Sequence, residues 1–278
     1  MGFVAQSSAM AAIGPWTYVA VRYVLAAVSV LPFALAEMRS APRALTRRER
    51  RGFVLIGVFL FSGSILQQVG MLTTSVTDAG FLTGLYVVFT PLIALLLLRA
   101  MPHWVVWPAA AAAFLGTVLI GGGSPGTLST GDFWVIGCAV FWSLQIIFVG
   151  LFAAESGRPF TLSLVQFAVS AMLGGIGAVL TEPVTATRLW AAAPQLVFGG
   201  VFSAGLAFTL QTLAQRWTTA PQAAIFLSSE ALFAALFGAI LLGERIPPIG
   251  YLGCGLIFAA MLAVELVPMR AEKGRLPV

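Results

Sequence analysis

Long apolar runs separated by short polar breaks follow one another along this chain from residue 16 onward. Most are close to 20 residues long, which suits a helix that crosses a bilayer and is about twice the length of a strand in a membrane barrel. The nine runs cover residues 16–36, 52–73, 77–98, 104–122, 131–153, 160–180, 194–214, 219–242 and 248–267. This pattern predicts an all-α, polytopic membrane protein.

Composition strengthens that prediction. Only 9% of the residues are charged and 59% are hydrophobic, whereas a soluble domain carries about 25% charged residues. So few charges cannot cover a surface that faces water, and the short links leave no room for a soluble domain.

The basic residues fall on alternate links. If the opening run 1–13 also crosses, twelve of the 15 Lys and Arg residues lie on one side, two on the other, and Arg22 lies within a run. Because cytoplasmic loops are rich in Lys and Arg, this predicts a cytoplasmic C-terminus. The charge then sets topology and predicts no nucleic-acid partner. Abundant Arg, Ala and Gly favour a bacterial inner membrane.

An internal repeat with an offset of 144 residues connects three pairs of short segments. It places Leu66-Gln67 on Leu210-Gln211, Pro15-Trp16 on Pro159-Phe160, and Trp107 on Tyr251. Each half then holds five spans, and an odd number inverts the second half relative to the first. We expect ten transmembrane helices in two inverted repeats, 1–124 and 125–278. The alternative is chance similarity among helices rich in Ala, Leu and Gly.

The opening stretch MGFVAQSSAMAAIGPW is too short to cross a bilayer by itself. It has no basic n-region, which argues against a signal peptide. By the repeat, it corresponds to the outer half of a first transmembrane helix that ends at Pro15. We therefore expect a first helix truncated at its N-terminus.

Three stretches resemble the EamA-type members of the drug/metabolite transporter (DMT) superfamily. They are GFVAQSSAMAAIGPWTYVAVRYVLAA, TSVTDAGFLTGLYVVFTPLIALLL and SSEALFAALFGAILLGERIPPIGYLGCGLIFAAMLAV, the last with the family's Gly243-Glu244-Arg245. Within this family, the sequence resembles the YddG-type amino-acid exporters. The resemblance implies a ten-helix transporter fold. Ala231 departs from it, since the family usually has Pro after the Glu of its ninth span.

Polar side chains within the runs are the informative ones, because they are costly in a bilayer unless they face the protein interior or a water-filled cavity. Several share helical faces, and they suggest a cavity rich in amides and hydroxyls with aromatic walls. The candidate lining residues are Gln6, Gln67, Gln68, Thr83, Tyr86, Trp142, Gln145, Gln211, Ser229 and Glu230. The alternative for each is a hydrogen bond between packed helices or ordinary core packing.

Three charged residues lie within or beside the apolar runs, and each has possible structural and functional roles. Glu230 lies about halfway along its run and needs a partner, a proton or access to water. Its possible functions are proton response and ammonium binding. Arg22 could bind a substrate carboxylate, pair structurally, or extend to the interface. Asp78 follows a link and is expected at a helix N-cap.

The leading interpretation is a secondary transporter that exports amino acids or similar small metabolites by alternating access. Multidrug efflux and nucleotide-sugar exchange are alternatives within transport, and a channel, a scaffold or an intramembrane enzyme are alternatives from other classes. One His, two scattered Cys and no nucleotide-binding motif predict no metal, no cofactor and no enzymatic activity. The expected partners are a small-molecule substrate and the lipid bilayer, and two halves in one chain favour a functional monomer.

Overall fold

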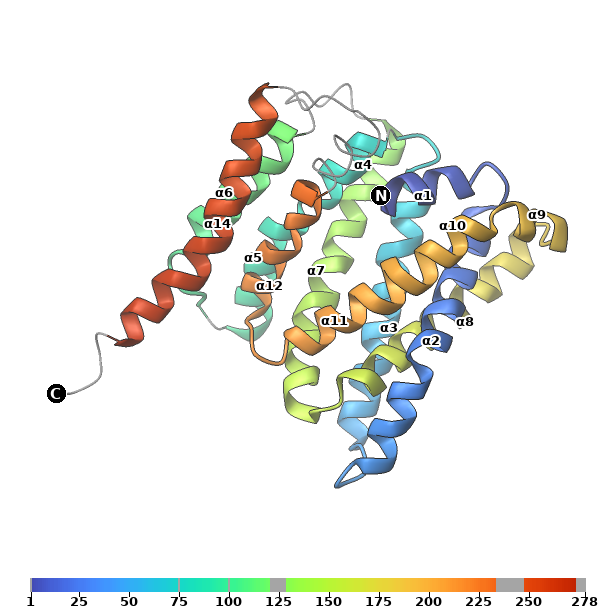
Figure 1. Cartoon of the computed structure of the whole chain (residues 1–278), viewed down its shortest axis with the longest axis horizontal. Helices are drawn as coiled ribbons and strands as arrows, with labels where there is room; N and C mark the ends of the chain where they lie inside the picture. The colour runs from blue at the N-terminus through green and yellow to red at the C-terminus, as the bar shows by residue number, and fades with distance from the viewer. Residues whose placement is uncertain (1, 75, 100, 121–128, 234–247, 274–278) are drawn as a thin grey trace.

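The computed structural model describes residues 2–74, 76–99, 101–120, 129–233 and 248–273, and these residues form helices joined by short turns (Figure 1). In chain order the helices are α1 (Gly2–Ala9), α2 (Pro15–Ser40), α3 (Arg47–Gly70), α4 (Val76–Thr83), α5 (Tyr86–Leu98), α6 (Val106–Ile120), α7 (Thr130–Ser156), α8 (Pro159–Thr181), α9 (Ala186–Ala191), α10 (Ala193–Val197), the π-helical η1 (Phe198–Leu206), α11 (Ala207–Ala214), α12 (Ala220–Leu227) and α14 (Pro248–Lys273). The all-helical prediction is confirmed.

Seven helices in the described part of the chain are long and apolar enough to cross a membrane, and α6 is a shorter apolar helix. The seven are Pro15–Ser40, Arg47–Gly70, Asp78–Leu98, Thr130–Ser156, Pro159–Thr181, Ala193–Ala214 and Pro248–Val267. The chain is thus a multi-pass membrane protein. The count of ten stays a prediction, because residues 234–247, with the Gly243-Glu244-Arg245 motif, lie outside the described residues.

Helix starts follow from local sequence. Pro15 and Pro159 occupy the first positions of α2 and α8, where a missing N–H costs nothing and the fixed φ suits a helix. A capping box begins α3, in which Thr46 and Glu49 exchange side-chain-to-backbone hydrogen bonds. Ser129 forms the same motif at the start of α7.

α2 and α8 form an antiparallel pair in which each helix caps the other. The Glu182 carboxylate, just after α8, accepts from the backbone N–H of Trp16 at 2.9 Å, and from the N–H and hydroxyl of Thr17 at 2.8 and 2.6 Å. Glu37, near the end of α2, accepts from Phe160 N at 3.2 Å and from Thr161 N and Oγ1 at 2.7 and 2.6 Å. Three donors thus meet one carboxylate at each end of the pair.

The offset of 144 recurs in the packing of this pair. Tyr23 and Phe167, which differ by 144, stack on each other with ring centroids 5.9 Å apart. The Trp16 ring packs against Gly177, and its counterpart Phe160 stacks on Phe33 at 5.7 Å. Contacts between residues and their own counterparts are those of a local two-fold axis between two inverted segments. The boundary of the halves at residues 124 and 125 stays a prediction.

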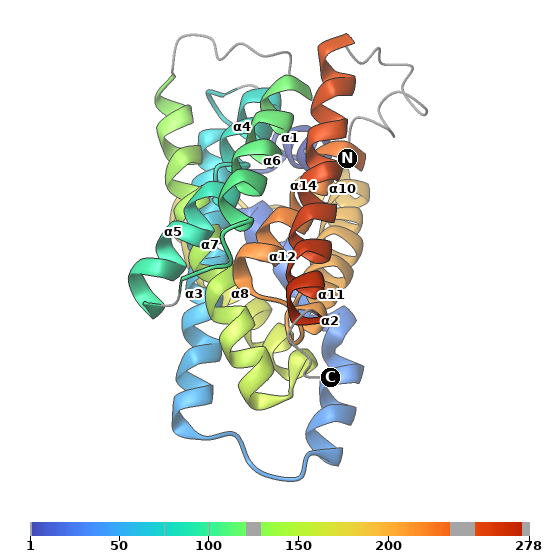
Figure 2. The same cartoon turned by 90° about the vertical axis from the view of Figure 1, so that its left-hand side faces the viewer.

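α6 and α14 pack side by side at the other edge of the bundle, left of the α2–α8 pair in Figure 1 and towards the viewer in Figure 2. Gly116 and Gly253 face each other where they cross: a Cβ on either would be pressed against the backbone oxygen of the other. The crossing therefore needs glycine on both helices.

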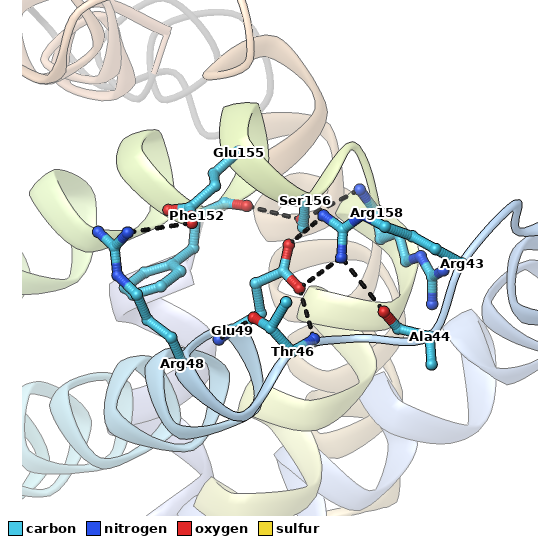
Figure 3. A network of polar contacts seen from close by, with 9 residues as sticks. All are labelled: Arg43, Ala44, Thr46, Arg48, Glu49, Phe152, Glu155, Ser156 and Arg158. Carbon is cyan, nitrogen blue, oxygen red and sulfur yellow. Dashed lines mark hydrogen bonds and ion pairs between the residues drawn. The ribbon is translucent and has the colours of Figure 1, made fainter.

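The bundle end that holds the α2–α3 link, residues 41–46, carries the polar network of Figure 3. Arg43 donates to both oxygens of Glu49, at 2.8 and 2.5 Å. Arg48 pairs with Glu155 at 3.2 Å. We call this end the linker end; its contacts connect the α2–α3 link and the start of α3 with the end of α7.

Two predicted runs are interrupted. The run 77–98 is two helices, because the α-helix breaks at Gly84 and Leu85. The run 194–214 contains the π-helical η1, in which Gly200 lies against Leu25 and the Arg22 carbonyl of α2. A wider turn at such a close approach fits the frequent use of π-turns at functional sites.

The opening run forms the eight-residue α1, followed by turns up to Gly14. Its counterpart by the offset, α7, has 27 residues. With eight residues, α1 is too short to cross a bilayer, which takes a helix of about 20 residues. Gly14 caps α2, and a Cβ there would overlap the Glu182 carboxylate.

Candidate functional site

A cavity of about 660 Å³ lies among the helices. Nine helices, with η1 counted among them, and the helical residues 229–233 contribute to its wall. The lining residues are Gly2, Gln6, Arg22, Gln67, Thr83, Tyr86, Trp142, Gln145, Ile146, Phe198, Phe202, Ser203, Ala207, Phe208, Gln211, Phe226, Leu227, Ser229, Glu230 and Phe233. Cavities that bind small molecules in proteins range from about 300 to 1,000 Å³.

Nine of the ten candidate residues from the sequence lie on this cavity: Gln6, Gln67, Thr83, Tyr86, Trp142, Gln145, Gln211, Ser229 and Glu230. The tenth, Gln68, does not line it. Gln68 is 1% exposed, and its Nε2 has no hydrogen-bond partner among the described residues. Neighbours on a helix point about 100° apart, so α3 can turn only one of Gln67 and Gln68 to the cavity. That the nine contact a substrate stays a prediction.

Arg22 lines the cavity from α2 and is also tied to η1. Its Nε donates to the Gly199 carbonyl at 3.2 Å, and its Nη2 donates to Ser203 Oγ at 3.3 Å. The guanidinium also lies 5.5 Å from the centre of the Tyr23 ring. These contacts hold a buried positive charge at the cavity wall. Arg22 is in neither of the two ion pairs found among the described residues.

Glu230 supplies the negative charge. Its side chain is exposed and lines the cavity. A Cβ on Gly2 would lie 3.9 Å from Glu230 Oε1 and 3.5 Å from Ser203 Oγ. Glu230 and the Arg22–Ser203 pair therefore flank the same glycine, and the cavity carries opposite charges on neighbouring parts of its wall.

Asp78 lies in the first turn of α4, where a carboxylate faces the positive end of the helix dipole. It does not line the cavity. Asp78 is the third residue of α4, so it lies inside the helix and not at the N-cap position that the sequence predicted.

Aromatic rings form the apolar part of the wall. Trp142 and Phe208 stack in parallel planes with centroids 5.3 Å apart. Phe198 and Phe202, one turn apart on η1, stack at 6.3 Å. Sequence reasoning left these three Phe residues out of the candidate site because Phe is also the usual residue of a lipid-facing surface. Phe198 and Phe202 are four residues apart, and this spacing gives only a weak signal.

Amide side chains on the wall are held by other side chains. Gln67 donates to Thr83 Oγ1 at 3.0 Å. Gln211 donates to Gln145 Oε1 at 3.2 Å. Cavity lining and hydrogen bonding between helices, which the sequence left as alternatives, therefore coincide in these residues.

Residues that could hold a metal ion are not grouped in the described part of the chain, where no three His, Cys, Asp or Glu side chains come together. Cys138 is buried and Cys254 half-buried, and both are free thiols. The arrangement suits reversible binding of a small polar molecule.

Comparison with known proteins agrees with this picture. The model of the EamA-like transporter family matches residues 1–122 and 129–266. An uncharacterized transporter of Archaeoglobus fulgidus is 28% identical over 261 residues, which cover 93% of this chain and 79% of that protein. One crystal structure superposes with a TM-score of 0.75 at 16% identity, over 97% of this chain and 96% of the other, and shows the fold alone. The chain belongs to the EamA-like transporter family of the DMT superfamily.

Proposed function

We propose that this transporter exports amino acids or similar small zwitterions across the bacterial cytoplasmic membrane. The observation that carries the proposal is the cavity wall, which presents the Arg22 guanidinium and the Glu230 carboxylate beside aromatic rings. A substrate carboxylate would bind the first, an ammonium group the second, and an apolar side chain the rings.

The alternatives within transport fit this wall less well. Nucleotide sugars carry phosphates, which proteins bind with several Arg or Lys residues, and Arg22 is the one Arg or Lys among the described lining residues. Multidrug efflux would suit the aromatic wall but makes no use of two opposite charges. We propose that the protein is of the YddG type, the amino-acid exporters that its sequence resembles.

The proposed cycle is alternating access between two inverted halves that share the cavity. The reciprocal contacts of α2 and α8 support such a relation between the halves. Energy would come from ion or substrate gradients, since no nucleotide-binding motif occurs in the sequence. The linker end and the C-terminus would face the cytoplasm, and the single chain would work as a monomer.

Uptake of labelled amino acids into proteoliposomes tests the proposal, with and without a pH gradient. We expect saturable uptake, and Glu230→Gln should reduce it about tenfold or more, because a charge-assisted hydrogen bond to ammonium contributes about 1.5–3 kcal/mol. Glu155→Gln, at an ion pair on the linker end outside the cavity, is the matched control and should transport as wild type.

No flux of any amino acid, or Glu230→Gln and Gln145→Ala both transporting like wild type, would contradict the proposal. Unsaturable flux would indicate a channel, dye efflux a multidrug transporter, and turnover of a substrate an enzyme. Flux that ignores the pH gradient would leave a uniporter.

A further inference from the structure

A row of four buried glutamine side chains and one threonine lies along the cavity, on α7, on α8, on α11 and at the residue that ends α11. Hydrogen bonds of 2.9 to 3.5 Å join its successive members. In order, the row contains Gln215, Gln211, Gln145, Gln166 and Thr212. Only Gln145 and Gln211 reach the cavity wall.

One end of the row determines which way its amides point. Gln215 Nε2 donates to the backbone carbonyl of Ile146 at 2.8 Å. A carbonyl oxygen only accepts, so Gln215 must turn its Oε1 toward Gln211. Gln211 Nε2 donates to that oxygen at 2.9 Å and to Gln145 Oε1 at 3.2 Å. Both N–H groups of the Gln211 amide are therefore used within the protein.

The other end requires the same direction. The Thr212 hydroxyl donates to the Phe208 carbonyl at 2.8 Å, so its oxygen accepts from Gln166 Nε2 at 3.5 Å. Gln166 Oε1 then accepts from Gln145 Nε2 at 3.2 Å. Amide orientation is often ambiguous, because the nitrogen and oxygen look alike. Here a backbone carbonyl at each end removes the ambiguity, since reversing one amide would set oxygen against oxygen.

The fixed direction of these amides matters at Gln211, which is 9% exposed to solvent, whereas Gln145 and Gln166 are fully buried. No described residue donates to Gln211 Oε1, and this oxygen is not among the buried atoms that lack a partner. Gln211 therefore points its Oε1, a hydrogen-bond acceptor, into the cavity. Hydrogen bonds to Gln145 and Gln215 hold the Gln211 amide in that orientation.

We propose that Gln211 Oε1 accepts an N–H of the substrate's ammonium group and makes the cavity select primary ammonium over quaternary ammonium. The inference rests on the proposed function for the cavity being a substrate site. Glu230 and the Trp142–Phe208 pair attract any cation, with or without N–H groups. A trimethylammonium group would satisfy these and leave Gln211 Oε1 without a donor. Sites built to bond an N–H strongly reject analogues that lack it.

Calorimetric titration of the purified full-length protein in detergent tests this inference with two cations that share a phenylethyl skeleton. 2-Phenylethylamine carries three N–H donors, and trimethyl(2-phenylethyl)ammonium carries none. We expect the wild type to bind the amine about 10 to 100 times more tightly, the range set by one unpaired buried polar group. Gln211→Met, of similar length, should bring the ratio close to one. Gln68→Met replaces a buried glutamine on α3 outside the cavity and should keep the wild-type ratio.

Gln215→Met is a second variant that leaves Gln211 in place but removes what orients it, and the ratio should fall by a smaller factor. It keeps the test valid if Gln211→Met does not fold. A wild-type ratio near one, an unchanged ratio in the Gln211 and Gln215 variants, or no binding of either probe would overturn the inference. Selective amine binding without flux of any amino acid would support the subsite and contradict the proposed function.

Discussion

The carboxylate of Glu182 offers the sharpest test of the reciprocal capping between α2 and α8. Glu182→Ala removes the acceptor of two backbone N–H groups and one hydroxyl at the start of α2. Glu37→Ala makes the same change at the start of α8. Because the donors Trp16 and Thr17 are the counterparts of Phe160 and Thr161, we expect the two variants to lose the same stability.

The magnitude follows from the bonds that are lost. Removing a helix N-cap costs about 0.5–2 kcal/mol, and a carboxylate beside the positive end of a helix adds about 0.3–1 kcal/mol. With three donors at each site, and with water able to reach the helix ends, we expect the free energy of unfolding to fall by about 2–3 kcal/mol. At about 2–4 °C per kcal/mol for a chain of this size, Tm should fall by about 4–12 °C.

Thermal unfolding in detergent, followed by tryptophan fluorescence, measures the loss. The signal sums the seven tryptophans of the chain, and one of them, Trp16, lies at the capped end with its ring packed on Gly177. Glu155→Ala serves as the control, because an exposed ion pair such as Arg48–Glu155 contributes at most about 1 kcal/mol.

Two results would refute this reasoning. If Glu182→Ala melts at the temperature of Glu155→Ala, the carboxylate does not stabilise the start of α2. If Glu37→Ala and Glu182→Ala differ by more than about 2 kcal/mol, the two ends are not energetic counterparts. Effects of sites far apart should add in the double variant.

Two further predictions concern the same helix pair. Gly177→Ala should lower the free energy of unfolding by about 1–3 kcal/mol, because its methyl group would overlap the Trp16 ring. Gly175→Ala, whose methyl group would meet nothing within 4 Å, should be neutral or stabilising. Equal melting temperatures of these two variants would contradict this prediction. Tyr23→Phe removes the 2.5 Å hydrogen bond to Ser64 and should cost about 1 kcal/mol in the same assay, whereas a melting temperature above that of the wild type would show that this bond does not stabilise the bundle.

The pattern of a single helix does not predict which of its polar residues line the cavity. Residues four apart, such as Ser64 and Gln68, share one face of α3, and Gln67 lies beside that face. In the structure Gln67 lines the cavity, while Ser64 bonds to Tyr23 and Gln68 is buried elsewhere. Periodicity identifies a polar face but not the element that the face meets, and only the packing of α3 against its neighbours decides that.

The contacts of the Glu37 and Glu182 carboxylates could not be predicted from the sequence either. Each stands near the end of an apolar run, where a charge is ordinary and predicts nothing. Their partners lie 123 to 166 residues away in the sequence. The offset of 144 predicted that the two halves are alike, but it did not predict that their second helices cap each other.

What the sequence determined by itself is local. Run length determined that the chain forms membrane helices, proline and capping residues such as Pro15, Pro159 and Thr46 determined where several begin, and the repeat indicated equivalent positions in the two halves. The tertiary structure alone decided that Gln211 shows an oxygen to the cavity. Hydropathy acts on one helix at a time, whereas the direction of an amide depends on donors and acceptors that three separate helices bring together.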